Sequence, residues 1–473
     1  MPAKRNYGDN CPIAAQAAQG AIAVIRTSGR GSVELLAKVF SRPRALLDAP
    51  GNAVVYGWIR SLEDIPVDEA LISVYRAPRS YTGEDGADIS CHGGSAAAKT
   101  ILEILKKTGF EEALPGEFTF RSFLNGKIDL TRSESVMEAV SARTKQGLEH
   151  AVKRLSGALE KEIKTIRDSL LDAVSSAELY LDYAEDEIDE GPPPYRKTVE
   201  ETLNKLKLFA ATYNRERIYQ EGALAVIAGR PNAGKSSLFN ALLNEDRSIV
   251  TEIPGTTRDW IEASVSIRGI PLRLADTAGI RELTGASFGN DEAEIKGIER
   301  SKSLLEEADI ILYTVDAGIG LNKEDKNFLK DHSAGFLVLV WNKIDLLKIK
   351  NVPGPEETSI VFPVVPVSAV TGKGLEELCT AISDLLTEKT TQNFSDSFST
   401  GPVAGLGTRR QKELTEKAAL LLEEVLEMEE KNESLDLIAP LLRESLDVLG
   451  EITGEISTAD ILEKMFSRFC LGK

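Results

Sequence analysis

The chain has 473 residues, of which 42% are hydrophobic, and this length is too great for a single core, so we expect two to four domains. Its net charge of −18 argues against a large basic surface for nonspecific nucleic-acid binding. No apolar run is long enough to span a bilayer, the first residues contain no apolar signal segment, and the four cysteines form no CxxC pair. We therefore expect a protein of a reducing compartment, with neither a structural zinc site nor a disulfide framework.

The first 125 residues alternate between short apolar runs and turns. Four runs rich in β-branched and aromatic residues are bounded by glycine, proline and charged residues, which is typical of strands. These predicted strands are 21–26, 54–59, 69–75 and 87–92. A helix is predicted at 95–107. Residues 1–125 are therefore expected to form an α+β domain.

Helical patterns dominate from about residue 126. Thr131 and Glu134 have the spacing of a capping box, which predicts that a helix begins there. Apolar residues then recur at helical spacing, namely Leu155, Leu159, Ile163, Ile166 and Leu170. A second helix is predicted around Val199, Leu203 and Leu206. After a polar linker at 389–402, helical periodicity returns at 413–428 and continues towards the C terminus.

Residues 223–238 contain a phosphate-binding loop in the context that it requires. A short apolar strand leads into the pattern Gly-x-x-x-x-Gly-Lys-Ser at 229–236, and a helix follows. Together the turn and the N terminus of the helix direct backbone N–H groups at a polyphosphate. Lys235 is placed to reach the β- and γ-phosphates, and the Ser236 hydroxyl is a candidate Mg²⁺ ligand.

Further motifs follow in the order that a GTPase requires. After the apolar strand 271–275, an aspartate can hold Mg²⁺ through water and a glycine N–H can sense a γ-phosphate. This motif consists of Asp276, Thr277, Ala278 and Gly279. Thr256 and Thr257 precede it as candidate ligands of Mg²⁺ and the γ-phosphate on a switch loop.

The base-recognition motif is Asn342, Lys343 and Asp345, after the strand 336–341. The Asp345 carboxylate matches the two N–H donors that guanine presents and adenine lacks, so GTP is favoured over ATP. Ser368 and Ala369 follow the next apolar run and can support the base. We expect a GTPase.

Two departures from small regulatory GTPases matter for the chemistry. Ile280 stands where those proteins place a glutamine that orients water. Arg258 is a candidate arginine finger, but it is equally consistent with a solvated charge on the switch loop. Another group must therefore orient the attacking water, and another cation must oppose the developing charge.

Helical segments on both sides of the nucleotide module suggest that this module is inserted into a helical bundle. Separate domains in series are the alternative. We favour insertion, with boundaries at 1–125, 126–220, 221–388 and 389–473.

The sequence resembles the tRNA modification GTPases of the MnmE (TrmE) family over essentially the whole chain. The matching stretches are 20–29, 80–94, 114–135, the GTPase motifs, 297–300 and 449–473. The resemblance implies a multidomain α+β and α/β protein with an N-terminal folate-binding and dimerisation domain. It also implies a split helical bundle and an inserted P-loop GTPase domain with a mostly parallel sheet.

As implied by the resemblance, the family modifies C5 of the wobble uridine in certain tRNAs. It does so in the cytoplasm as a homodimer that forms a heterotetramer with an FAD-containing partner of the MnmG (GidA) type. The one-carbon unit comes from 5-formyltetrahydrofolate or a related folate. K⁺-dependent pairing of GTPase domains activates hydrolysis, and the complex brings in the tRNA.

The resemblance assigns roles in the nucleotide site, where Ala233, Gly234 and Ser237 complete the phosphate loop around Lys235. The implied K⁺ ligands, which take the place of an arginine finger, are Asn232, Thr251, Ile253 and Thr256. Ser236 and Thr257 are implied Mg²⁺ ligands. Glu294 matches the glutamate that orients the attacking water, with Glu292 as a rival because the stretch after Gly279 is longer than usual.

The resemblance also implies a folate site that contains Arg26, Glu84, Lys127 and Lys473. A carboxylate suits the adjacent N–H donors of a pterin, and basic groups suit the negative tail of folate. Near the C terminus, Phe466 and Phe469 are expected to anchor the tail and carry Cys470, a candidate for chemistry, towards this site.

Two other functional classes stay open on the sequence alone. One is a GTPase switch that binds RNA during ribosome assembly, although no KH-type GxxG module or basic tail follows the GTPase motifs. The other is a scaffold unrelated to RNA whose dimerisation is controlled by nucleotide.

Overall fold

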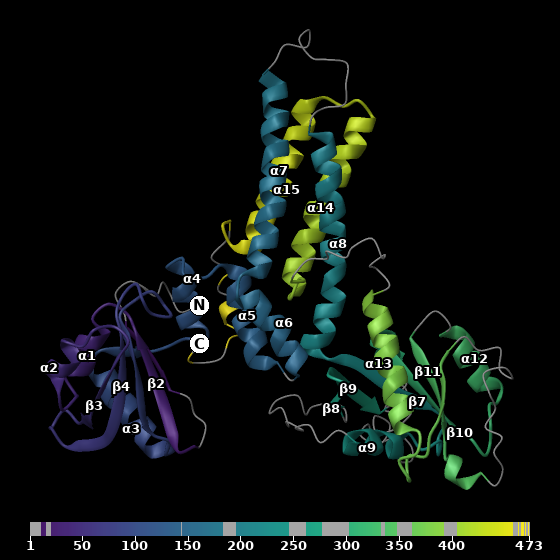
Figure 1. Ribbon diagram of the computed structural model, residues 1–473, viewed down its shortest axis with the longest axis horizontal. Coiled ribbons are helices and arrows are strands. Elements are labelled where there is room, and N and C mark those ends of the chain that lie inside the picture. Colours follow the sequence, from purple (N-terminus) through teal and green to yellow (C-terminus); the bar gives the residue numbers. More distant parts are fainter. Residues whose placement is uncertain are drawn as a thin grey trace, which may run out of the picture. The chain divides into compact units, whose positions relative to one another are not determined.

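A computed structural model describes most of the chain in two compact units. The described residues are 11–15, 20–142, 144–182, 195–245, 262–276, 302–332, 336–347, 362–391, 404–456, 462, 465–467, 469 and 472. The first unit consists of 1–137, 155–167 and 443–473, and the second consists of 138–154 and 168–442. Each unit therefore combines segments that are far apart in the sequence (Figure 1).

The first unit is built on a six-stranded sheet in the order β3-β4-β5-β2-β1-β6. Its strands are β1 (Cys11–Ala15), β2 (Ile22–Ser28), β3 (Ala53–Arg60), β4 (Pro66–Tyr75), β5 (Gly86–His92) and β6 (Phe110–Glu112). All pairs are antiparallel except β1 with β6, which is parallel. The four sequence-predicted strands of this region are confirmed, whereas β1 and β6 were not predicted.

Helices cover one face of this sheet. They are α1 (Ser32–Ala37), α2 (Pro43–Leu47) and α3 (Ser95–Thr108), and α3 confirms the predicted helix. Leu36, Leu46 and Ile101 belong to the same buried core as alternate residues of the strands. On the other face, every second residue of β3 is exposed. The helix-covered face holds the core, and the opposite face is available for binding.

The C-terminal end of the chain returns to the first unit. Phe466 and Phe469 are buried with Leu130, and the aromatic rings of Phe120 and Phe123 pack beside Phe466. Phe120 and Phe123 lie in α4 (Glu117–Leu124). The expected anchoring of the tail by its two phenylalanines is therefore seen, while Cys470 and Lys473 lie outside the described residues.

The second unit contains another six-stranded sheet, in the order β12-β11-β10-β7-β9-β8. Its strands are β7 (Ala223–Gly229), β8 (Glu262–Ile267), β9 (Ile270–Asp276), β10 (Ile310–Asp316), β11 (Leu337–Asn342) and β12 (Val364–Pro366). Only β8 runs antiparallel to its neighbour, and the remaining pairs are parallel. This is the mostly parallel sheet of a P-loop GTPase domain. The helices α9 (Lys235–Glu245), α12 (Lys323–Asp331) and α13 (Leu375–Thr391) belong to the same module.

The long helices form the rest of the molecule. They are α5 (Leu130–Ser141), α6 (Lys145–Leu155), α7 (Ala158–Asp182), α8 (Arg196–Glu221), α14 (Arg409–Glu430) and α15 (Leu435–Thr453). The division between the two units falls within α5, α6, α7 and α15. In the second unit α8 packs along α14 and leads directly into β7 (Figure 1). An N-terminal α+β domain, a helical domain and a GTPase domain are thus present, whereas the four domain boundaries stay a prediction.

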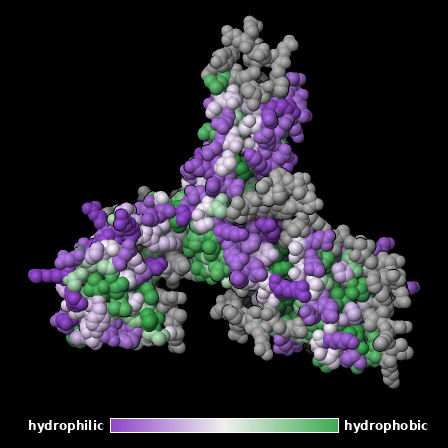
Figure 2. Space-filling view, in the orientation of Figure 1, coloured by the Kyte–Doolittle hydropathy of each residue, from purple (hydrophilic) through white to green (hydrophobic). Residues whose placement is uncertain are grey.

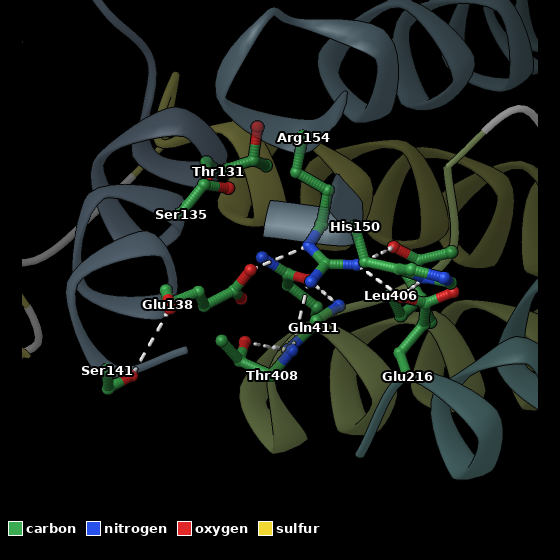
Figure 3. A network of polar contacts seen from close by, with 12 residues as sticks. Thr131, Ser135, Glu138, Ser141, His150, Arg154, Glu216, Leu406, Thr408 and Gln411 are labelled. Atoms are coloured by element: carbon green, nitrogen blue, oxygen red, sulfur yellow. Dashed lines mark hydrogen bonds and ion pairs between the residues drawn. The ribbon is translucent and has the colours of Figure 1, made fainter. Parts of the chain in front are cut away.

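A buried arginine joins three segments of the second unit (Figure 3). Arg154 Nε donates to Glu138 Oε2 at 2.7 Å, and Arg154 Nη1 donates to Glu216 Oε2 at 2.6 Å. The same Nη1 lies 3.5 Å from the carbonyl oxygen of Gly405. His150 Nδ1 also bonds Glu216 Oε2, at 2.7 Å. The end of α8, where the chain enters the GTPase module, and the segment that follows this module are therefore both attached to Arg154.

Two local predictions about the helices need correction. Thr131 does not begin a helix, because α5 begins at Leu130 and Asp129 Oδ1 accepts the backbone N–H of Arg132 at 3.0 Å. The single helix expected through Leu155 and Leu170 is two helices, since α6 ends at Leu155 and α7 begins at Ala158. Between them Gly157 has a φ of 92°, which a helix cannot accommodate.

Candidate guanine-nucleotide site and a second polar pocket

The phosphate loop connects β7 to α9, as its sequence predicts. Gly234 has a φ of 92°, and a Cβ there would lie 2.2 Å from Asn342 Nδ2, so only glycine fits. Asn232 has a φ of 62°, a left-handed conformation that asparagine tolerates better than most residues. The loop is therefore set by residue types that accept these backbone angles.

Lys235 is buried in the loop, and its Nζ donates to the carbonyl oxygens of Gly229 at 3.0 Å and Arg230 at 2.9 Å. These bonds hold the ammonium group under the turn where phosphates are expected. Ala233 is buried, whereas Ser236 and Ser237 are exposed at the start of α9.

Two oxygen-bearing side chains meet at the end of this loop. Ser236 Oγ donates to Asp276 Oδ2 at 2.8 Å, and Asp276 is the last residue of β9. A hydroxyl and a carboxylate side by side are the kind of oxygen donors that Mg²⁺ prefers. The described residues therefore fit the predicted metal site.

The base-recognition residues follow β11 and touch the phosphate loop. Asn342 Nδ2 donates to the Ala233 carbonyl oxygen at 3.0 Å, and Asn342 Oδ1 accepts the N–H of Ala369 at 3.1 Å. Ser368 is fully buried, and its Oγ donates to Asp345 Oδ1 at 2.6 Å. Ser368 thus orients the carboxylate expected to read guanine, whereas direct support of the base by Ser368 and Ala369 stays a prediction.

Lys343 connects the base-recognition motif to the phosphate loop. Its Nζ donates to the carbonyl oxygen of Asn232 at 2.6 Å and to Asp316 Oδ2 at 2.8 Å. Sequence reasoning missed Asp316, because nothing in its local pattern indicates that the end of β10 lies beside the end of β11. The parallel register of these two strands pairs Asp316 with Asn342.

A second candidate site lies in the first unit, in a cavity of about 340 Å³. Its polar lining includes Arg26, Lys127, Asp88, Tyr75 and Tyr81. Arg26 forms two hydrogen bonds with Asp88, from Nε to Oδ1 at 3.0 Å and from Nη2 to Oδ2 at 3.1 Å. Burial raises the pKa of the Tyr81 hydroxyl, whose ring lies 5.8 Å from the Arg26 guanidinium.

The basic groups of this pocket also meet backbone oxygens. Arg26 Nη1 lies 3.4 Å from the carbonyl oxygen of Gly472, next to the end of the chain. Lys127 Nζ donates to the Pro78 carbonyl oxygen at 3.0 Å. The structure therefore brings two of the four predicted folate residues together and places the C-terminal tail beside one of them.

Glu84 is not one of the described residues that line this pocket. Both of its carboxylate oxygens accept hydrogen bonds from Arg121 Nη1, at 3.0 and 3.2 Å, and Oε2 also accepts from Ser28 Oγ at 2.7 Å. Ser28 and Thr82 line the pocket and lie between it and Glu84. Sequence reasoning missed Arg121, which fixes this carboxylate from behind.

Other sequence-predicted site residues lie outside the described residues. In the nucleotide site these are Thr251, Ile253, Thr256, Thr257, Arg258, Thr277, Ala278, Gly279, Ile280, Glu292 and Glu294. In the folate site they are Cys470 and Lys473. No helix within the described ranges is both long enough and apolar enough to cross a membrane.

Two family models match this chain and together cover most of it. The family model for the GTP-binding protein TrmE N-terminus matches residues 10–127, and the model for the MnmE helical domain matches residues 130–470. The G domain of the T. maritima FeoB iron transporter is 29% identical and covers 34% of this chain and 98% of its own, but its TM-score of 0.25 adds nothing to the assignment.

Full-length relatives are similar along the whole sequence. The tRNA modification GTPase MnmE of Treponema denticola is 41% identical, over 99% of this chain and 99% of its own. The protein of the same name from Carboxydothermus hydrogenoformans is 40% identical, over 96% of this chain and 97% of its own. The chain is a P-loop GTPase that belongs to the MnmE (TrmE) family of tRNA modification GTPases.

Proposed function

We propose that the protein is the GTP-hydrolysing component of a cytoplasmic complex that modifies C5 of the wobble uridine in certain tRNAs. Its partner in this proposal is an FAD-containing protein of the MnmG (GidA) type, with which a homodimer of this chain forms a heterotetramer. The one-carbon unit comes from 5-formyltetrahydrofolate or a related folate. The tRNA is bound through the complex, since the net charge of −18 gives this chain no general affinity for RNA.

The observation that carries the proposal is the presence of two chemically different sites on one chain. The second unit holds a phosphate loop joined to a guanine-recognition motif by Asn342 and Lys343. The first unit holds a separate pocket with Arg26 and Lys127 in its lining. A GTPase that acted only as a switch would not need the second pocket.

For the nucleotide site we propose that Ser236 and Thr257 bind Mg²⁺, with Asp276 acting through water. Lys235 then contacts the phosphates, and Asp345 selects guanine. The hydrogen bond between Ser236 and Asp276 supports this arrangement, because it places both donors at one point beside the loop. Bound Mg²⁺ would neutralise charge on the β- and γ-phosphates.

For hydrolysis we propose that K⁺ supplies the positive charge that an arginine finger would provide elsewhere. Its ligands are Asn232, Thr251, Ile253 and Thr256, and Glu294, or its rival Glu292, orients water. Asn232 is exposed, and its backbone is held in position by Lys343, which suits a side chain that must meet an ion at a domain surface. Pairing of two GTPase domains then completes the site.

For folate we propose binding in the pocket of the first unit by Arg26, Glu84, Lys127 and Lys473, with Cys470 near the transferred one-carbon unit. The pterin contact of Glu84 requires its carboxylate to exchange the Ser28 hydroxyl for the ligand, because Arg121 already holds it from the other side. The Gly472 carbonyl beside Arg26 supports a role for the tail at this site.

The homodimer finds support in the open face of the first sheet. Large hydrophobic side chains are exposed there on neighbouring strands, namely Ile22, Val24, Val54, Tyr56, Trp58 and Leu71. The register places Tyr56 opposite Leu71, and places Leu71 and Val24 on either side of Ser90. Figure 2 shows hydrophobic residues gathered over the strands of this unit. Apolar surface of this kind marks an interaction site, and we assign it to a second copy of the chain.

The first experiment tests the modification itself. Nucleosides of tRNA from a strain lacking this gene should have lost the C5 substituent of the wobble uridine, and the full-length gene should restore it. Intact modification in the deletion strain would refute the proposed function. It would leave the GTPase assignment untouched.

The second experiment tests K⁺ activation. GTP turnover by the full-length protein should be at least tenfold faster in KCl than in NaCl of equal ionic strength. Asn232→Ala should abolish this difference, while Asn240→Ala, an exposed asparagine in α9, should preserve it. Equal rates in the two salts would exclude the K⁺ mechanism.

The third experiment tests the folate pocket by calorimetry with 5-formyltetrahydrofolate. Arg26→Ala should weaken binding at least tenfold, because it removes a charged hydrogen-bonding partner from the pocket, whereas Arg30→Ala alters an exposed arginine outside the pocket lining and should not. Equal affinities for these two variants would remove Arg26 from the site.

The dimer surface is tested by analytical ultracentrifugation. Leu71→Asp should shift the protein to monomers. Leu62→Asp, which changes an exposed leucine in the turn before β4, should leave it dimeric. A dimeric Leu71→Asp protein would place the interface elsewhere.

A further inference from the structure

The turn after β10 is fixed tightly to the strand that precedes the base-recognition motif. Asp316 is the last residue of β10, and its Oδ1 accepts the backbone N–H of Gly318 at 2.8 Å. The N–H of Ala317 donates to the carbonyl oxygen of Asn342 at 2.9 Å. These two bonds leave the Asp316 carboxylate little freedom, so its second oxygen has a defined direction.

That second oxygen meets the ammonium group of Lys343. Asp316 Oδ2 is 2.8 Å from Lys343 Nζ, and the same Nζ is 2.6 Å from the carbonyl oxygen of Asn232. The side chain of Asp316 is 16% exposed and that of Lys343 is 30% exposed, so water screens the pair only in part. Burial alone would raise the pKa of Asp316, but the Lys343 hydrogen bond and the Gly318 N–H outweigh it and lower the pKa. The carboxylate is therefore charged at neutral pH.

The segment that begins with Asp316 also holds the phosphate loop at a second point. Arg230 Nη2 donates to the carbonyl oxygen of Gly320 at 2.7 Å, and Arg230 Nε lies 3.1 Å from Asp325 Oδ2. Asp325 is buried and also accepts the hydroxyl of Tyr313 at 2.8 Å. Arg230 is thus attached directly to the segment 316–325, and Asn232 is attached to it through Lys343.

We propose that Asp316 is a positioning residue for the guanine nucleotide. It holds the Lys343 ammonium against the Asn232 carbonyl, so that the base-recognition motif and the phosphate loop keep their binding geometry before the nucleotide arrives. Because these bonds hold the two segments together, their loss adds an ordering cost to nucleotide binding. Asp316 then determines affinity rather than turnover. This inference depends on the GTPase assignment alone, and not on the folate, K⁺ or tRNA roles proposed above.

The test uses the full-length protein and a fluorescent N-methylanthraniloyl-GDP probe. Asp316→Asn keeps the shape of the side chain and an acceptor for the Gly318 N–H, but removes the charge that Lys343 meets. We expect about a tenfold rise in Kd, which is typical for the loss of a charged hydrogen bond. The KM for GTP should rise in parallel, and kcat at saturating GTP should stay within twofold. Asp331→Asn is the matched control, because Asp331 is an exposed aspartate at the end of α12 in the same module.

A double-mutant cycle separates this role from a purely structural one. In the background of Lys343→Met, which itself weakens binding, Asp316→Asn should cause less than a twofold further loss, since its partner is already gone. Asp316→Glu, which keeps the charge, should bind the probe within threefold of the natural protein. Unchanged affinity of Asp316→Asn, or the same loss with and without Lys343, would overturn the proposal.

Discussion

Two buried arginines, Arg121 in the first unit and Arg154 in the second, have the same chemistry and different positions in the chain. Each side chain is 1% exposed and lies between two glutamates. The partners of Arg121 are Glu117, one turn earlier in the same helix, and Glu84, from a loop next to the pocket of the first unit. The partners of Arg154 are Glu138 and Glu216, which are 16 and 62 residues away.

The difference shows that the same kind of buried ion triad can serve two purposes in one protein. The bond from Arg121 to Glu117 is local and survives wherever α4 forms, whereas its bonds to Glu84 reach a carboxylate near the pocket. Arg154 instead holds α5, α8 and the segment at Gly405 together. A buried charge that loses its partner is costly, and the cost is spread over every element that the charge joined. Arg154 should therefore govern stability, and Arg121 should govern a site.

The largest effect is expected for Arg154→Met, which leaves Glu138 and Glu216 buried without their cation. Local unfolding of α8 and α14 should become easier by about 3–5 kcal/mol. Hydrogen exchange of peptides from these helices measures this free energy. Arg409→Met removes an exposed arginine that pairs with the exposed Glu413, and it should leave this free energy unchanged. Similar protection in the two variants would contradict the assigned role.

The next effect is the pH dependence that comes from Glu216. Burial alone would raise its pKa, but the hydrogen bond from His150 and the charge of Arg154 lower it from 4.5 to about 2. Because the folded state then binds fewer protons than the unfolded state, this stability is present above about pH 4.5 and is lost as the pH falls towards 2.

Glu216→Gln should therefore cost about 3 kcal/mol at pH 7 but only about 1.5 kcal/mol at pH 3. The free energy of α8 opening, followed by hydrogen exchange at both pH values, provides the comparison. Glu427→Gln, at an exposed position of α14, should show no such convergence. If the free energy of α8 opening differs between Glu216→Gln and the natural protein by the same amount at both pH values, Glu216 is not held ionised in the folded state.

The next effect is expected for Arg121→Met, about 2–3 kcal/mol, because Glu117 stays buried without its cation while Glu84 is 21% exposed and can regain water. Its effect on the pocket should be larger than its effect on stability, with binding of 5-formyltetrahydrofolate weakened by more than tenfold. Calorimetry and thermal melting of the same sample provide both numbers. A variant that melts earlier yet binds folate normally would remove the distinction between the two arginines.

The smallest effect is expected for Thr408→Ala. Thr408 lies between Gly405, whose carbonyl contacts Arg154, and the start of α14. Thr408 caps α14, with its side chain accepting the N–H of Gln411 and the Gln411 side chain accepting the N–H of Thr408. Thr408→Ala should cost about 1 kcal/mol, as measured by exchange in the first turn of α14. If Thr408→Ala lowers the stability of α14 more than Arg154→Met does, then the cap, and not the arginine, holds the residues between Gly405 and Thr408 in place.

The sequence predicts local structure well in this protein, and it predicts little that depends on distant pairing. The phosphate loop, the strand before Asp276 and the base-recognition motif depend on residue types at fixed spacing, and all are found where expected. Lys343 was recognised, but its partner Asp316 was not, because strand register brings the two together. β1 and β6 are short, and they pair with each other although Cys11 and Phe110 lie far apart in the sequence, so they leave only a weak local pattern.

The pocket of the first unit was predictable only in part, for a similar reason. Arg26 and Lys127 line the pocket as the family pattern indicates. Asp88, which holds Arg26, and Arg121, which holds Glu84, lie in the matching stretches 80–94 and 114–135, but the resemblance assigns neither of them a role. From sequence alone, a charged side chain outside a recognised motif is expected at the surface, and only the fold shows which groups it contacts.

The position of the carboxyl end has a practical consequence for anyone who handles this protein. The Gly472 carbonyl meets Arg26, and Phe466 and Phe469 fasten the preceding turn. Because Arg26 lines the pocket, a purification tag or fluorescent reporter fused after residue 473 would follow closely on a contact with the pocket lining, and we expect it to disturb ligand binding. Ligand affinities of this pocket should be measured on protein whose carboxyl end carries no added residues, since a weak result from a fused protein would describe the fusion.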